Sequence, residues 1–256
     1  MKIHFFTSPL EQFQIYPILP IRLGFIDISI TNQVIILGLI LFLLSIFSLS
    51  LISKSLSLSF FPNRWQAVVE VIHNMVMSLV ADNVKSKEGQ YFFPLVFTVF
   101  VFVLSMNLIG LVPFSFTVTS HILVTFALSL AVFIGINIIC VKKHGIKFFC
   151  LFLPAGTSVT LAFLLVPIEF ISYMFKPISL SIRLFANMMA GHMLLKVIAG
   201  FAFTLMANVG ILFLVHFFPL LILIPLFLLE LGVALIQAFV FSILICIYLN
   251  DSINLH

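Results

Sequence analysis

Charge is scarce in this chain of 256 residues. Only 8% of the residues are Asp, Glu, Lys or Arg, whereas 63% are hydrophobic. A soluble domain is about one-quarter charged and about half apolar, so this chain has too little polar surface to cover itself in water. The composition therefore excludes soluble enzyme folds and predicts an integral membrane protein.

Other absences restrict the function further. The three cysteines, Cys140, Cys150 and Cys246, have neither the spacing of a redox pair nor that of a metal site. The net charge of +4 is too small and too scattered for a nucleic-acid-binding protein. The chain also has no glycine-rich phosphate-binding loop ending in Lys and Ser or Thr. We therefore expect no metal, no cofactor and no nucleotide site.

Stretches without charge predict the first membrane spans. Residues 28–53 and 89–141 contain no Asp, Glu, Lys or Arg. Since a helix needs about 20 residues to cross a hydrocarbon core about 30 Å thick, the second stretch is too long for one crossing. It divides naturally at Gly110 and Pro113, which are typical of turns. The predicted spans are residues 33–53, 91–111 and 120–141.

Residues 64–82 follow a different pattern. Apolar residues recur there at helical spacing, and polar residues occupy much of the remainder. This pattern predicts an amphipathic helix, which we expect to lie along the membrane surface. Packing against another subunit would use the same face, so that alternative stays open. The apolar face consists of Trp65, Val68, Val69, Ile72, Val76, Leu79 and Val80.

Two long apolar segments, residues 158–203 and 207–250, follow the third span. As a continuous helix, each would be on the order of 65–70 Å long, over twice the thickness of the hydrocarbon core. Either each segment breaks into two helices, for example at Pro177 or Pro225, or both helices tilt steeply. Composition leaves both options open.

Basic residues predict the orientation. Counting each long segment as one crossing, five crossings place the two termini on opposite sides of the membrane. The side that holds most basic residues faces the cytoplasm or the matrix. We therefore expect the N-terminus outside and the C-terminus inside. The basic residues on the inner side are Lys54, Arg64, Lys85, Lys87, Lys142, Lys143 and Lys147.

Ionisable residues inside a membrane are costly and usually functional. In the segment 158–203, Glu169, Lys176 and Arg183 are spaced by seven residues and share one helix face, which Asn187 joins one turn later. His192 lies on the opposite side of that helix.

A second polar stripe lies in the segment 207–250 and just beyond it. Glu230, Gln237 and Asp251 are separated there by multiples of seven residues. Two long apolar helices with facing polar stripes predict an antiparallel hairpin whose polar seam is hidden from lipid.

The predicted depths of these residues suggest a mechanism. His192 and Glu230 would be reachable from outside, and Glu169 and Asp251 from inside, with Arg183 near the midpoint between them. Glu and His exchange protons near neutral pH in a suitable environment, whereas Arg stays charged. A proton path is therefore interrupted at Arg183, and a mobile partner must carry the proton past it.

Simpler roles stay open for some of these residues. An ion pair between Glu169 and Lys176 would hold the hairpin together without any part in transport. Asn187 and Gln237 would serve as hydrogen-bonding contacts between helices. Arg183 differs, because it has no acid within one turn and therefore needs a partner from elsewhere.

The sequence around these residues is distinctive. Residues 167–169 are Pro-Ile-Glu, and residues 176–192 are Lys-Pro-Ile-Ser-Leu-Ser-Ile-Arg-Leu-Phe-Ala-Asn-Met-Met-Ala-Gly-His. With Glu230 and Gln237 at matching separations, this pattern closely resembles subunit a of the F-type ATP synthase. Residues 8–13 and 107–113 are also similar to that family, so the resemblance covers essentially the whole chain.

The resemblance implies a proton-translocating stator subunit in the membrane sector of the synthase. Its last two helices would be strongly tilted against a rotating ring of c subunits, with peripheral-stalk and other membrane-sector subunits as further partners. Arg183 would face the ring carboxylates, release their protons and prevent a leak between two half-channels. Asn187 and Gln237 resemble the polar residues that flank this arginine.

The resemblance also implies which residues line each half-channel. His192 and Glu230 would line the one open to the intermembrane space, and Glu169 and Asp251 the one leading to the matrix. ATP chemistry would belong to partner subunits, so the chain alone would be inactive.

The resemblance further implies a location. His192 and Glu230 are arranged as in mitochondrial members, whereas many bacterial members have an acid at the first position and a His at the second. The 32 phenylalanines fit an AT-rich organellar gene. We therefore expect the mitochondrial inner membrane, with the N-terminus in the intermembrane space and the C-terminus in the matrix. A bacterial plasma membrane is the alternative.

Two other function classes make different demands on the sequence. A proton-coupled secondary transporter or redox-pump subunit would need its own substrate site or a His pair for haem, and the seven histidines offer no convincing pair. An assembly scaffold without transport would tolerate Arg183→Gln, because hydrogen bonding would replace the charge.

Overall fold

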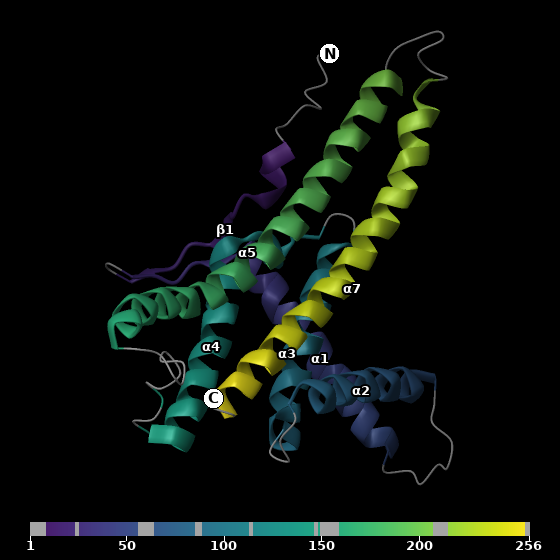
Figure 1. Cartoon of the computed structure of the whole chain (residues 1–256). Coiled ribbons are helices and arrows are strands. Elements are labelled where there is room, and N and C mark those ends of the chain that lie inside the picture. Colours follow the sequence, from purple (N-terminus) through teal and green to yellow (C-terminus); the bar gives the residue numbers. More distant parts are fainter. Residues whose placement is uncertain are drawn as a thin grey trace. The chain divides into compact units, whose positions relative to one another are not determined.

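The computed structural model describes residues 9–23, 26–55, 64–84, 89–112, 115–145, 148, 159–206 and 215–253. Helices dominate this part of the chain (Figure 1). They are α1 (Asn32–Ser55), α2 (Arg64–Asn83), α3 (Gly89–Gly110), α4 (Ile122–His144), α5 (Val159–Met206) and α7 (Phe217–Ile253). Five of these helices, all but α2, are long and apolar enough to cross a membrane. The predicted all-α membrane fold is therefore confirmed.

The two long C-terminal segments form continuous helices. α5 has 48 residues with Pro167 and Pro177 inside it, and α7 has 37 residues with Pro225 inside it. At 1.5 Å per residue they are about 72 Å and about 55 Å long. Figure 1 shows a bend in the early part of α5, as interior prolines produce. Neither helix breaks in two, and their steep tilt in the membrane stays a prediction.

Several helix ends differ from the expected ones. α7 begins at Phe217, and the expected residues 207–214 lie outside the described part of the chain. α4 begins at Ile122, two residues later than expected, because Val118–Ser120 form a separate short 3-10 helix. Inside that turn the Ser120 hydroxyl donates to the Thr117 carbonyl at 2.6 Å. This local hydrogen bond competes with continuation into the helix.

The N-terminal region contains structure that the sequence pattern did not predict. A short 3-10 helix (Pro9–Phe13) precedes strands β1 (Pro17–Leu19), β2 (Arg22–Leu23), β3 (Ile26–Asp27) and β4 (Ile30–Thr31). β1 pairs with β4 and β2 pairs with β3, both antiparallel. The chain therefore doubles back on itself before α1 begins.

The contacts divide the chain into two compact units. Unit 1 comprises Met1–Ile46, Leu104–His121 and Leu184–Gln237, and unit 2 comprises the remaining residues. In unit 1, α5 and α7 run antiparallel and side by side (Figure 1). Met188 of α5 and Ala234 of α7, both fully buried, pack there with Leu111. A small residue such as Ala234 allows close approach of helices inside a membrane.

Unit 2 has its own apolar cluster. The rings of Phe133 in α4 and Tyr173 in α5 lie 4.9 Å apart, with Phe148 and Val166 packed against them. Thr125 and Ser181 connect the same two helices through their hydroxyls at 3.4 Å. Apolar and hydroxyl contacts together therefore hold α4 against the first part of α5.

Within unit 2, α2 buries only part of its apolar face. Val76, Leu79 and Val80 are buried, whereas Trp65 and Val68 are 68% and 50% exposed. The exposed part of the face is available to the membrane surface or to another subunit, as the amphipathic pattern predicts.

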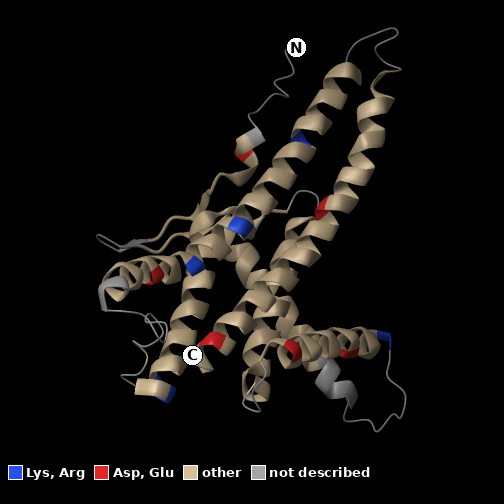
Figure 2. Ribbon diagram, viewed as in Figure 1, with Lys and Arg blue, Asp and Glu red and all other residues tan. Residues whose placement is uncertain are grey.

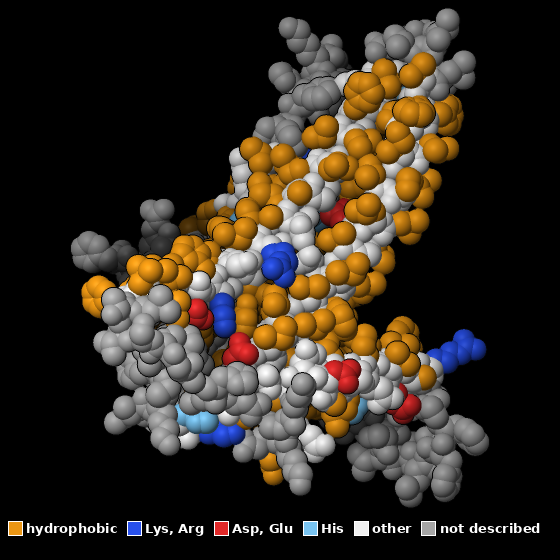
Figure 3. All heavy atoms as spheres, in the orientation of Figure 1, with side chains coloured by type: hydrophobic (Ala, Val, Ile, Leu, Met, Phe, Trp, Pro, Cys, Tyr) orange, Lys and Arg blue, Asp and Glu red, His pale blue; other side chains and the backbone are white. Residues whose placement is uncertain are grey.

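Large apolar side chains cover the outside of the long helices. Figure 3 shows hydrophobic side chains over most of the visible faces of α5 and α7, and Phe163 and Leu221 are 87% and 69% exposed. Charged residues are few along the ribbons of the same helices (Figure 2). A surface of this kind is stable against lipid or a partner rather than against water.

A larger side chain at position 234 tests whether the cluster of Leu111, Met188 and Ala234 is tightly packed. We expect Ala234→Leu to destabilise the protein by about 1–3 kcal/mol, because added methylene groups meet a fully packed site. In native membranes, the temperature at which a protease digests the chain should fall by several degrees. The matched control is Leu235→Met, since Leu235 is 44% exposed and should tolerate the change. Equal melting of both variants would contradict this packing.

Candidate functional site

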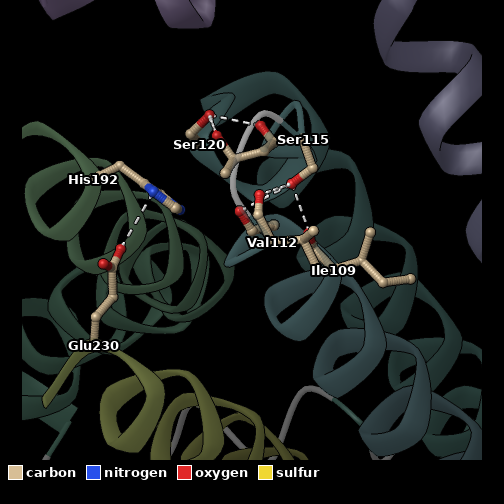
Figure 4. Close-up of polar contacts among 8 residues, drawn as sticks. Ile109, Val112, Ser115, Ser120, His192 and Glu230 are labelled. Atoms are coloured by element: carbon tan, nitrogen blue, oxygen red, sulfur yellow. Dashed lines mark hydrogen bonds and ion pairs between the residues drawn. The ribbon is translucent and has the colours of Figure 1, made fainter. Parts of the chain in front are cut away.

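His192 and Glu230 form a buried pair in unit 1. His192 lies in α5 and Glu230 in α7, and their Nδ1 and Oε1 atoms are 3.5 Å apart (Figure 4). The side chains are 15% and 3% exposed. The sequence predicted both residues as members of one path, and the structure brings them into contact.

Gly191 makes room for the carboxylate of Glu230. A Cβ atom at position 191 would lie 2.7 Å from Glu230 Oε1 and 3.2 Å from its Cγ. Real Cβ atoms do not approach other atoms so closely, so any larger residue would displace the Glu230 side chain. The glycine before His192 therefore lets the carboxylate lie against the backbone of α5.

The buried polar atoms of the pair are incompletely satisfied. The two carboxyl oxygens of Glu230 have no hydrogen-bond partner among the described residues. The same is true of the Nε2 atom of His192. A buried carboxyl group without a hydrogen bond is strongly unfavourable. Such a group needs a bound proton or a water molecule beside it. A site that exchanges protons provides both.

Asn107 is another buried polar residue of unit 1. It lies in α3, is fully buried, and donates from Nδ2 to the Ala234 carbonyl of α7 at 3.3 Å. Its Oδ1 atom has no hydrogen-bond partner among the described residues. The sequence pattern indicated no role for this residue, although an amide in the last turn of an apolar span was a usable signal. Gln237 of α7 is also buried in this unit, at 9% exposure.

The segment that follows α3 is held by hydrogen bonds of its own. The Ser115 hydroxyl donates to the carbonyls of Ile109 and Val112 at 2.7 and 2.8 Å (Figure 4). The Ile109 carbonyl lies in the last turn of α3, where carbonyls have no partner within the helix, and Val112 follows two residues after the helix ends. Burial lowers the pKa of His121, which lies just before α4. Its imidazole ring stacks on that of Phe116, with 5.0 Å between the ring centres.

Arg183 stands at the middle of α5. It is exposed, and no described carboxylate lies within ion-pair distance of it. Asn187, one turn further along the same helix, is half-buried. A permanent cation at the centre of a long apolar helix needs an anionic partner, which the described part of the chain does not provide.

Unit 2 contains a second pair of opposite charges. Lys176 Nζ of α5 lies 3.5 Å from Asp251 Oδ2 of α7. The ion pair between Glu169 and Lys176, one of the options that the sequence left open, is therefore not the one observed. Glu169 is exposed, and no described residue forms an ion pair with it. The structure thus joins His192 to Glu230, but it does not join Glu169 to Asp251.

Comparison with known proteins agrees with the resemblance. The family model of the ATP synthase A chain matches residues 33–250. A protein of Chondrus crispus named ATP synthase subunit a is 50% identical over 258 residues, which cover 100% of both chains. The protein of the same name from Pylaiella littoralis is 52% identical over 98% of this chain and 100% of its own. Another, from Paramagnetospirillum magneticum, is 42% identical over 98% of this chain and 100% of its own.

Two glycines of α5 provide a matched test of the His192–Glu230 geometry. Gly191→Ala should push the Glu230 carboxylate away from His192, whereas Gly200→Ala meets nothing within 4 Å. Because Ala is better than Gly in a helix by about 1 kcal/mol, Gly200→Ala should stabilise the protein and Gly191→Ala should lose that gain. The thermal midpoints and a structure of each variant check this. An unchanged pair in Gly191→Ala would contradict the packing described.

Proposed function

The chain belongs to the ATP synthase A chain family, and from that premise we propose how its residues move protons. It is the proton-translocating subunit of the membrane sector of an F-type ATP synthase and a member of that complex. We propose that two separate half-paths end at Arg183. Protons cross the gap between them on the carboxylates of a rotating ring of c subunits.

The buried His192–Glu230 pair is the observation that carries this proposal. It supplies two titratable groups in contact, from two helices, beside the apolar cluster of Leu111, Met188 and Ala234. The unsatisfied oxygens of Glu230 favour a proton or water beside them. We assign the pair to the half-path that opens to the outer side of the membrane.

Arg183 is proposed as the barrier between the half-paths. Its guanidinium cannot release its proton in a protein, so it blocks direct proton passage. Its exposure and its place at the middle of α5 suit a contact with an anionic group of another subunit. An arriving ring carboxylate would give up its proton to pair with Arg183, which is the favourable form of such a contact.

The half-path to the inner side is assigned to Glu169 and Asp251. Asp251 lies at the C-terminal end of α7, and Glu169 lies in the first part of α5. Both are exposed, so a water-filled path or a ring subunit reaches them without crossing an apolar core. Asn187 and Gln237 are proposed as polar neighbours that orient the arginine.

The proposed setting is the mitochondrial inner membrane, with the N-terminus in the intermembrane space and the C-terminus in the matrix. Moving one charge through 100 mV releases about 2.3 kcal/mol, so several protons must pass for each ATP formed. Each proton advances the ring by one carboxylate, and peripheral-stalk subunits hold this chain still. The nucleotide chemistry takes place on other subunits.

Removing the carboxyl group at position 230 tests the proposal. We expect Glu230→Leu to reduce ATP-driven proton pumping by at least about a hundredfold, because the path loses its proton-exchanging group. Glu230→Asp should retain part of the activity. Pumping is measured with a pH-sensitive dye in liposomes that contain the purified complex, after its subunit composition has been verified.

The control is Glu70→Gln, because Glu70 is exposed on α2 and has no part in either half-path. Pumping should stay at the wild-type rate in this variant. A Glu230→Leu complex that assembles and still pumps normally would overturn the assignment of the outer half-path.

A further inference from the structure

Lys176 is enclosed by three groups of unit 2. Its Nζ atom lies 3.5 Å from Asp251 Oδ2, 5.1 Å from the centre of the Tyr173 ring and 4.8 Å from the centre of the Tyr248 ring. Tyr173 belongs to α5, whereas Tyr248 and Asp251 belong to α7. Two aromatic faces and one carboxylate therefore fix the position of the ammonium group.

The groups around Lys176 are themselves held by α4. The hydroxyl of Tyr173 donates to Asn137 Oδ1, and its ring packs on Phe133. Tyr173 is only 8% exposed. One wall of the lysine site is therefore attached to a neighbouring helix and does not depend on Lys176.

The end of α7 is also anchored independently. Cys140 donates from Sγ to the Ser252 carbonyl at 3.4 Å, and His144 donates from Nε2 to the Ile253 carbonyl at 3.1 Å. Carbonyls in the last turn of a helix have no partner within the helix. These two contacts from α4 therefore fix the backbone at residues 252 and 253. Asp251 directly precedes these residues, so its backbone is held as well.

The ion pair contributes little to this anchoring. The side chains of Lys176 and Asp251 are 27% and 46% exposed, and ion pairs that are this open add little stability. With the backbone of Asp251 fixed by α4, the remaining freedom at this point is the rotation of the carboxylate. Lys176 is the group that restricts it.

We propose that Lys176 is a positioning residue for Asp251. It holds the half-exposed carboxylate in one orientation at the end of the inner half-path, where a proton released from the ring is passed on. The lysine takes no proton itself and acts only through Asp251. This inference rests on the proposed role of Asp251 as an inner half-path residue.

Variants that remove or keep the positive charge at position 176 test this proposal. We expect Lys176→Met to slow ATP-driven proton pumping about tenfold and Lys176→Arg to slow it no more than about threefold, since misplacing a reacting group is costly and Arg keeps the donor. Pumping is measured with the assembled complex in liposomes. The thermal midpoint of the complex should stay within about 2 °C, as expected for an open ion pair. Lys142→Met, at an exposed position at the end of α4, is the control.

A double-mutant cycle separates this inference from the proposed function. If Lys176 acts through Asp251, Lys176→Met combined with Asp251→Asn should pump at the rate of Asp251→Asn alone. Normal pumping by Asp251→Asn would overturn the proposed role of Asp251. Impaired Asp251→Asn with normal Lys176→Met would overturn the positioning role alone. Equal losses in Lys176→Met and Lys176→Arg, with lower thermal midpoints, would also overturn it, because they indicate a packing role.

Discussion

A permanent positive charge in the middle of a membrane helix constrains everything else in this protein. Placing an arginine at the centre of a spanning helix costs about 2.5–3.5 kcal/mol on insertion scales. α5 carries Arg183 at its midpoint, exposed, with no described carboxylate within ion-pair distance. In the proposed mechanism, the compensating anion comes from another subunit. A ring of carboxylate-bearing subunits, as proposed above, would meet that requirement.

The other charged groups are arranged so that they do not neutralise the arginine. Glu230 is in contact with His192 in unit 1, and Asp251 is in contact with Lys176 in unit 2. Glu230 and Asp251 therefore each have a partner other than Arg183. This arrangement keeps Arg183 available to a passing carboxylate, which an intramolecular salt bridge would prevent.

The sequence predicted the helices well because charge-free stretches and membrane thickness together leave few solutions. It also predicted that His192 and Glu230 line one half-channel, and the structure shows that the two side chains are in contact. It could not predict that Lys176 contacts Asp251 instead of Glu169, because spacing within one helix does not fix the register against another. The short N-terminal strands were missed because strands of two or three residues carry no periodic pattern. Asn107 received no role because its contact with Ala234 joins residues far apart in the sequence.

The most direct measurement concerns Arg183 itself. Membranes that carry the Arg183→Ala complex should be tested for proton-driven ATP synthesis and for passive proton leak. The account predicts an assembled complex that makes no ATP and leaks protons, because the barrier between the half-paths is gone. Normal synthesis without added leak would contradict the account and leave the chain with a purely structural role.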